Sequence, residues 1–142
     1  MPIENDGSER RTFTPSLSEL ALEDYLVQNL RDLDSSLTFE ARQVRTDVGI
    51  IDILAKESTG MVIIELKAGE ADDVAVAQVA RYLGWMKQKE QSGDKFLRRR
   101  FRAILLASSF TDGARCAAAV IPDVTLYQFR LSRLLFSEVS TQ

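Results

Sequence analysis

The chain has 142 residues, of which 45% are hydrophobic and 27% charged, the composition of a soluble globular domain. It contains no histidine, which excludes Ser-His-Asp and Cys-His catalysis, histidine metal ligands and nucleases with a histidine base. The net charge of −3 hides an asymmetry: residues 1–73 hold 16 acidic and 7 basic side chains, and residues 74–142 hold 5 and 11. Any hydrolysis must therefore use carboxylates, lysine and a metal-bound water.

Cysteine usage and hydropathy bear on where the protein works. The single cysteine, Cys116, permits no internal disulfide, which fits a reducing compartment. No apolar run approaches the roughly 20 residues of a membrane span. Residues 1–12 are polar and lack the apolar centre of a secretory signal. We therefore expect a cytoplasmic protein with no membrane partner.

The pattern of elements predicts one domain over residues 16–136, between a flexible leader (1–15) and a tail (137–142). Ser16 or Ser18 can cap a first helix. The remaining elements are strands at 37–46, 48–56 and 61–67, a helix from about 72 to 89, a strand at 101–107, a helix at 111–120 and a strand at 124–129. The order α-β-β-β-α-β-α-β predicts an α/β fold in which a meander and β-α-β crossovers form one mixed sheet flanked by helices.

The second and third strands carry charged residues inside or directly after apolar runs. Asp52 interrupts the run 50–54, and the run 61–64 leads into Glu65-Leu66-Lys67. A hairpin turn centred between residues 58 and 59 would place Asp52 directly across from Glu65, with Lys67 on the same side. Opposed carboxylates in an apolar sheet repel, and a divalent cation such as Mg²⁺ or Mn²⁺ removes that repulsion. The spacing therefore predicts a metal site next to an ammonium group.

Each of these residues has a simpler interpretation. Glu65 and Lys67 could be the solvated end of a strand. Asp52 could cap a turn or pair with Arg42 or Arg45, and a one-residue shift of the hairpin would turn the two carboxylates to opposite faces.

The segment 81–102 carries eight basic residues and two acidic ones, and it ends in Arg98-Arg99-Arg100-Phe101-Arg102. Such clusters make sequence-independent contacts to phosphates. A solvated loop and helix face is the alternative. We expect nucleic-acid contacts from seven side chains in all: Arg45, Arg81, Tyr82, Arg98, Arg99, Arg100 and Arg102.

The long helix presents Gln78 within a surface of small apolar residues. Its amide could orient a nucleophilic water or the lysine, or it could be an ordinary surface glutamine. Aromatic residues such as Tyr82 and Trp85 more often belong to the core than to a DNA-binding surface, and for Trp85 we keep the core interpretation.

Four elements in this order resemble the PD-(D/E)XK nuclease superfamily: an acid in the first helix, Gly49-Ile50-Ile51-Asp52, Glu65-Leu66-Lys67, and Gln78 with Arg81-Tyr82. The sequence resembles even more closely the catalytic domain of NucS/EndoMS-type mismatch endonucleases, over roughly residues 16–130. The resemblance implies a restriction-endonuclease-like core. It implies that Asp52, Glu65 and the Leu66 backbone carbonyl are the metal ligands. It also implies catalytic roles for Lys67, Gln78 and Glu19, with Glu23 as the alternative to Glu19.

These observations favour a Mg²⁺- or Mn²⁺-dependent DNA endonuclease, acting in repair or in defence or phage DNA processing. Members of the resembled family carry a separate N-terminal DNA-binding and dimerising domain. We therefore expect DNA as substrate, with a homodimer or a DNA-targeting partner in place of that domain. The alternatives are a non-catalytic nucleic-acid-binding module of the same fold and a protein-interaction module of a repair or defence complex.

Overall fold

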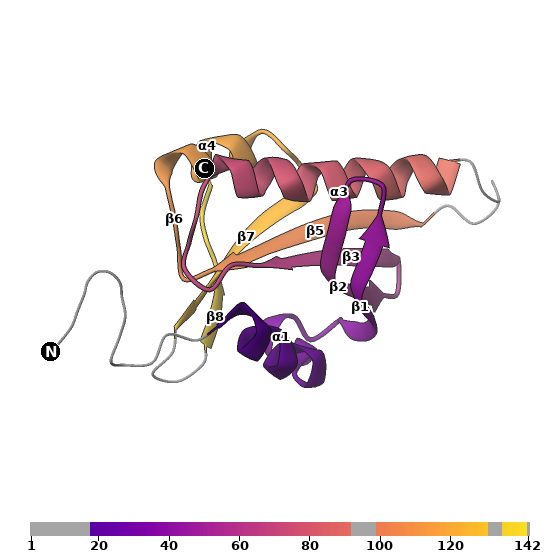
Figure 1. Cartoon of the computed structure of the whole chain (residues 1–142), viewed down its shortest axis with the longest axis horizontal. Coiled ribbons are helices and arrows are strands. Elements are labelled where there is room, and N and C mark those ends of the chain that lie inside the picture. The colour runs from indigo at the N-terminus through magenta and orange to yellow at the C-terminus, as the bar shows by residue number, and fades with distance from the viewer. Residues whose placement is uncertain (1–17, 92–98, 131–134, 142) are drawn as a thin grey trace, which may run out of the picture.

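The computed structural model describes residues 18–91, 99–130 and 135–141 (Figure 1). The expected leader (1–15) and Arg98 lie outside these residues. The described helices are α1 (Glu19–Gln28), α2 (Leu30–Leu33), α3 (Asp73–Gln91) and α4 (Asp112–Ala119). The described strands are β1 (Thr38–Thr46), β2 (Gly49–Glu57), β3 (Gly60–Leu66), β4 (Glu70–Ala71), β5 (Arg100–Ala107), β6 (Ser109–Phe110), β7 (Val124–Arg130) and β8 (Leu135–Glu138).

The main sheet has six strands in the order β1-β2-β3-β5-β7-β8. β1, β2 and β3 are antiparallel, β3, β5 and β7 are parallel, and β8 returns antiparallel to β7. This arrangement confirms the predicted mixed α/β fold, and the expected strands and later helices end within two residues of the observed bounds. The short elements α2, β4, β6 and β8 were not predicted. Among the described helices, none is both long and apolar enough to cross a membrane.

The first helix begins where its sequence allows a cap. The Ser18 side chain accepts a hydrogen bond from the Ala21 backbone N–H at 3.0 Å, which satisfies one of the unpaired donors of the first turn. α1 ends at Gln28, and the short α2 continues the leucine pattern after Asn29. The buried leucines of both helices pack on one face of the sheet: Leu22, Leu26, Leu30 and Leu33.

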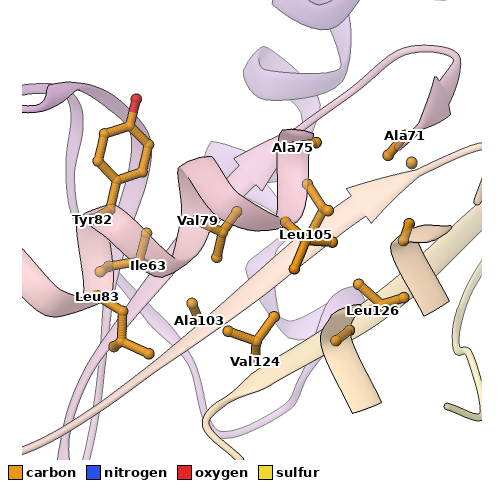
Figure 2. Packing of buried hydrophobic residues seen from close by; sticks show 14 of the residues in the cluster. Ile63, Ala71, Ala75, Val79, Tyr82, Leu83, Ala103, Leu105, Val124 and Leu126 are labelled. Carbon is orange, nitrogen blue, oxygen red and sulfur yellow. The ribbon is translucent and has the colours of Figure 1, made fainter. Parts of the chain in front are cut away.

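Helices α3 and α4 cover the opposite face, so the sheet lies between two apolar layers (Figure 1). In the α3 layer, Val79 lies close to Leu105 in the centre of the sheet, and Leu83 lies toward Ala103 (Figure 2). Burial on both faces explains why β3 and β5 are nearly continuous apolar runs rather than alternating ones.

The β2–β3 hairpin has the predicted register. Ile53 pairs with Ile64, Leu54 with Ile63, and Glu57 with Gly60. The turn therefore brings the last residues of β3 across from the beginning of β2.

The domain extends beyond residue 136, where we expected a tail to begin. β8 continues to Glu138, the Val139 backbone N–H donates to Leu126 O at 2.8 Å, and the Val139 side chain is buried. The expected boundary is too early because a short edge strand with one buried valine leaves little hydrophobic pattern in the sequence.

Gly60 and Gly84 make a matched pair of tests of this packing. A Cβ at Gly60 would lie 1.8 Å from the Arg100 carbonyl oxygen, whereas a Cβ at Gly84 would meet nothing within 4 Å. We expect Gly60→Ala to lower the free energy of unfolding by about 3 kcal/mol or more, because β3 and β5 must separate. Gly84→Ala should raise it by about 1 kcal/mol, because alanine favours the helix. Chemical denaturation measures both, and equal effects would contradict the close approach of β3 and β5.

Candidate functional site

Asp52 and Glu65 lie side by side where β2 and β3 meet, as the hairpin register predicts. The Leu66 backbone N–H donates to Asp52 Oδ2 at 2.9 Å, and the Asp52 backbone N–H donates to Glu65 Oε1 at 3.4 Å. Glu65 is 7% exposed and Asp52 is half-buried. Each carboxylate is thus held by the backbone of the opposite strand.

This pairing carries an electrostatic cost. Burial and, to a smaller extent, the negative charge of Asp52 together raise the pKa of Glu65 from 4.5 to about 8. Burial also raises the pKa of Asp52, where the Leu66 N–H acts in the opposite direction and the charges of Glu23 and Glu19 add to the increase. The site therefore concentrates negative charge in a place where water cannot fully solvate it.

Lys67 provides positive charge at this place. It follows the last residue of β3, its backbone N–H donates to Leu106 O at 2.8 Å, and its side chain is half-buried. The ammonium charge of Lys67 lowers the pKa of Glu65, against the effect of burial.

Helix α1 brings two more carboxylates to the pair. Glu19 Oε2 accepts from the Ala68 backbone N–H at 3.4 Å, directly after Lys67. Glu23 is buried and accepts hydrogen bonds from Arg42 Nε and Gln43 Nε2, both at 2.8 Å. Glu23 is therefore already neutralised by a cation, while Glu19 lies at the open end of β3.

Three side chains of α3 hold the turn that precedes Asp52. Gln78 Nε2 donates to Val48 O at 3.4 Å, and the Tyr82 hydroxyl donates to Ile50 O at 2.8 Å. Trp85 Nε1 donates to an Asp47 carboxylate oxygen at 3.2 Å.

A glycine makes this close contact possible. Gly49 has φ 134°, and a Cβ there would come within 2.7 Å of the Tyr82 hydroxyl oxygen. Tyr82 is 2% exposed, which fits the core and leaves almost no side-chain surface for the nucleic-acid contact that we expected of it. Gln78 lies against the turn.

Residues 18–121 match the family described as the endonuclease NucS C-terminal domain. The chain belongs to this family. It is 34% identical over 108 residues to endonuclease NucS of Pyrococcus furiosus, which covers 75% of this chain and 37% of that protein. It is 34% identical over 98 residues to endonuclease NucS of Methanocaldococcus jannaschii, covering 68% of this chain and 35% of that one. The chain thus spans little more than a third of the length of these relatives.

Solved structures agree with the family assignment. A structure of EndoMS with double-stranded DNA superposes with a TM-score of 0.59 and 27% identity, covering 80% of this chain and 44% of that one. A repair endonuclease from Pyrococcus abyssi superposes with a TM-score of 0.64 and 24% identity, covering 85% and 50%, and shows the shared fold.

The arginines of this NucS-family chain fall into two groups. Arg45 is exposed in β1, and Arg81 is exposed on α3 and donates to the Gln78 side chain, so both lie near the turn. Arg100 pairs with Gly60 at the start of β3, whereas Leu105 pairs with Glu65. At about 3.3 Å per residue, Arg100 lies about 16 Å along the strand from the level of Glu65, and Arg102 about 10 Å.

Two members of that second group are engaged in ion pairs. Arg102 Nη2 lies 2.8 Å from a Glu57 oxygen and 3.0 Å from an Asp34 oxygen, which raises the pKa of Arg102. Arg99 pairs with Glu90 at 3.1 Å. These contacts join strands and helices, so they serve the fold directly.

The sequence did not predict a role for Gln43 at the site, nor the ion pair between Glu23 and Arg42. The alternative pairing of Asp52 with Arg42 is not what the structure shows, because Arg42 contacts Glu23 and Asp24 at 2.8 and 2.7 Å. Gln43 has no signal in the hydrophobic pattern, and its backbone conformation, with φ 53°, could not be read from the residue type.

The raised pKa of Glu65 predicts how stability depends on pH without divalent metal. The folded protein holds a proton on Glu65 up to about pH 8, whereas the unfolded chain releases it near 4.5. This contribution to the free energy of unfolding is therefore fully present below pH 4.5 and is lost as the pH rises to about 8. At about 1.4 kcal/mol per pKa unit, the loss amounts to a few kcal/mol at most.

Glu65→Gln should flatten this decline, measured by denaturation in EDTA across the same pH range. Glu70→Gln removes an exposed carboxylate outside the acid pair and should keep the wild-type slope. Parallel curves for wild type and Glu65→Gln would contradict the buried, charged environment of Glu65.

Proposed function

We propose that this chain is a Mg²⁺- or Mn²⁺-dependent DNA endonuclease of the PD-(D/E)XK type that acts in DNA repair. The observation that carries the proposal is the buried Asp52–Glu65 pair with Lys67 at the end of the same strand. The named endonucleases among its relatives support the reaction class, and the EndoMS complex with double-stranded DNA supports DNA as the substrate.

The donor set suits a hard divalent cation. Mg²⁺ usually takes one or two carboxylates and keeps water molecules in its remaining positions. Among the described residues, no group of three acidic, histidine or cysteine side chains is arranged to hold a metal by itself. Asp52 and Glu65, with the Leu66 backbone carbonyl, would therefore hold the ion, and water and a substrate phosphate would complete its shell. Such an ion, when bound, polarises the phosphate and acidifies a bound water.

The chain's own residues have distinct tasks in this proposal. Lys67 stabilises the charge that develops on the phosphate or positions the attacking water. Glu19, beside the Ala68 N–H, is the first-helix acid. Gln78 orients the water in addition to holding the turn, and Tyr82 keeps that turn in place.

DNA contacts follow from the exposed cations. Arg45 and Arg81 are near enough to hold the backbone beside the cut, and Arg100 would contact a more distant phosphate. Arg99 and Arg102 contribute less to DNA binding, because carboxylates already neutralise their charges in part. We propose that a second copy of the chain or a DNA-targeting partner adds further DNA contacts.

Metal binding should be visible in thermal stability. Mg²⁺ or Mn²⁺ at a hundred times its Kd should stabilise the protein by about 2.7 kcal/mol, because it binds only the folded state. Asp52→Asn should abolish the shift and leave metal-free stability unchanged or higher, because it removes a half-buried charge beside Glu65. Asp112→Asn changes an exposed carboxylate on α4 and should retain the shift. Equal shifts in wild type and Asp52→Asn would exclude this metal site.

Cleavage separates the enzyme from a binding module. Lys67→Ala should fold, bind DNA and lose roughly 10²–10³-fold in kcat, because it removes a charge that acts mainly in the transition state. Lys87→Ala, which breaks only a surface pair with Asp123, should cut normally. The assay uses single-stranded, duplex and mismatched DNA with Mg²⁺, Mn²⁺ or EDTA. A wild type that binds DNA and cuts none of these substrates would favour the non-catalytic nucleic-acid-binding module.

A further inference from the structure

Gln43 adopts a backbone conformation that glutamine normally avoids. Its φ of 53° is in the left-handed region, and it is the only residue other than glycine with positive φ in the described ranges 18–91, 99–130 and 135–141. This conformation is unfavourable for residues with a Cβ, and such outliers persist where the surrounding structure requires them. Gln43 is also exposed, so core packing does not impose the conformation.

The β1–β2 ladder keeps its register at this point but omits one pair. Arg42 pairs with Ile53 and Val44 with Ile51, which leaves Gln43 opposite Asp52 between two ladder pairs. Ile51 packs in the α3 layer and Ile53 in the α1 layer, although a regular strand would direct both to one face. The alternation of β2 therefore breaks at Asp52.

The side chain of Gln43 bridges two carboxylates across this break. Its amide nitrogen donates to Glu23 Oε2 at 2.8 Å and to Asp52 Oδ1 at 3.5 Å. The other oxygen, Asp52 Oδ2, accepts from the Leu66 N–H. One oxygen of Asp52 thus accepts from β1 and the other from β3, so the two contacts restrict rotation of the carboxylate.

The chemistry of an amide suits this position. One NH₂ group has two hydrogens and can bridge two anions, and it is neutral. A lysine or arginine here would also bridge the carboxylates, but its charge would compete with a metal cation. The partner Glu23 is itself fixed, because it is buried and bonded to Arg42.

We propose that Gln43 is a positioning residue that orients Asp52 for metal binding from a fixed support on α1. The inference rests on the nuclease function proposed above and extends it to a residue of β1. Groups that orient metal ligands typically contribute 10- to 100-fold to metal affinity or activity.

The test uses two variants that suit the left-handed backbone and lack the reach of glutamine. Gln43→Asn keeps the amide on a side chain one methylene shorter, and Gln43→Gly removes it, while both residues tolerate positive φ. We expect both variants to melt near the wild-type temperature. The midpoint of the Mn²⁺-induced melting shift should rise 10- to 100-fold. At fixed Mn²⁺, kcat should fall by a similar factor, KM for DNA should stay unchanged, and excess Mn²⁺ should restore cleavage. Gln88→Asn, at an exposed position on α3, is the control and should match wild type in every assay.

Two outcomes are distinct from each other. If wild type binds Mn²⁺ and cuts DNA, and both Gln43 variants match its Mn²⁺ midpoint and its kcat, the side chain serves only the backbone irregularity and the positioning role is wrong. If wild type shows neither a Mn²⁺-dependent melting shift nor cleavage, the nuclease proposal is wrong, and the role of Gln43 is wrong with it.

Discussion

The repulsion between Asp52 and Glu65 is the constraint on which the rest of the site depends. Two carboxylates with raised pKa values are held together by the register of one hairpin and by two backbone N–H groups. Nothing in strand pairing favours such a pair, and an isolated hairpin could relieve it by shifting one residue. The surrounding apolar layers prevent that shift, because it would move side chains that pack in one layer into the other.

The two helical layers act on the pair in different ways. On one face, α1 presents Glu19 and Glu23, whose negative charges act on Asp52. Glu23 also accepts a hydrogen bond from the Gln43 amide. On the other face, α3 fixes the turn before Asp52 through Gln78 and Tyr82. Residues from both faces of the sheet thus act on the acid pair. Helix α3 serves the site mainly by restricting the backbone that leads to Asp52.

The sequence was informative wherever one strong pattern decided the outcome. The polar turn between two apolar runs predicted the hairpin register, and with it the contact between Asp52 and Glu65, because turn position and alternation leave few choices. The resemblance favoured Glu19 over Glu23, but the residues alone did not separate them, since they lie one turn apart on α1 and only the structure shows that Glu23 pairs with Arg42. The role of the arginine run was also ambiguous, because the partners of Arg102, Glu57 and Asp34, are distant from it in sequence. The break at Gln43 leaves no trace in hydrophobicity at all.

The contact between Trp85 and Asp47 gives the molecule a natural optical reporter. Trp85 is the single tryptophan of the chain, it is half-buried, and its indole N–H is bonded to the turn that leads into β2. Indole emission moves to longer wavelength when the ring gains contact with water, so fluorescence excited at the tryptophan band comes from this one place. Opening or tightening of the turn can therefore be followed in solution without any label, on the unmodified chain and in real time.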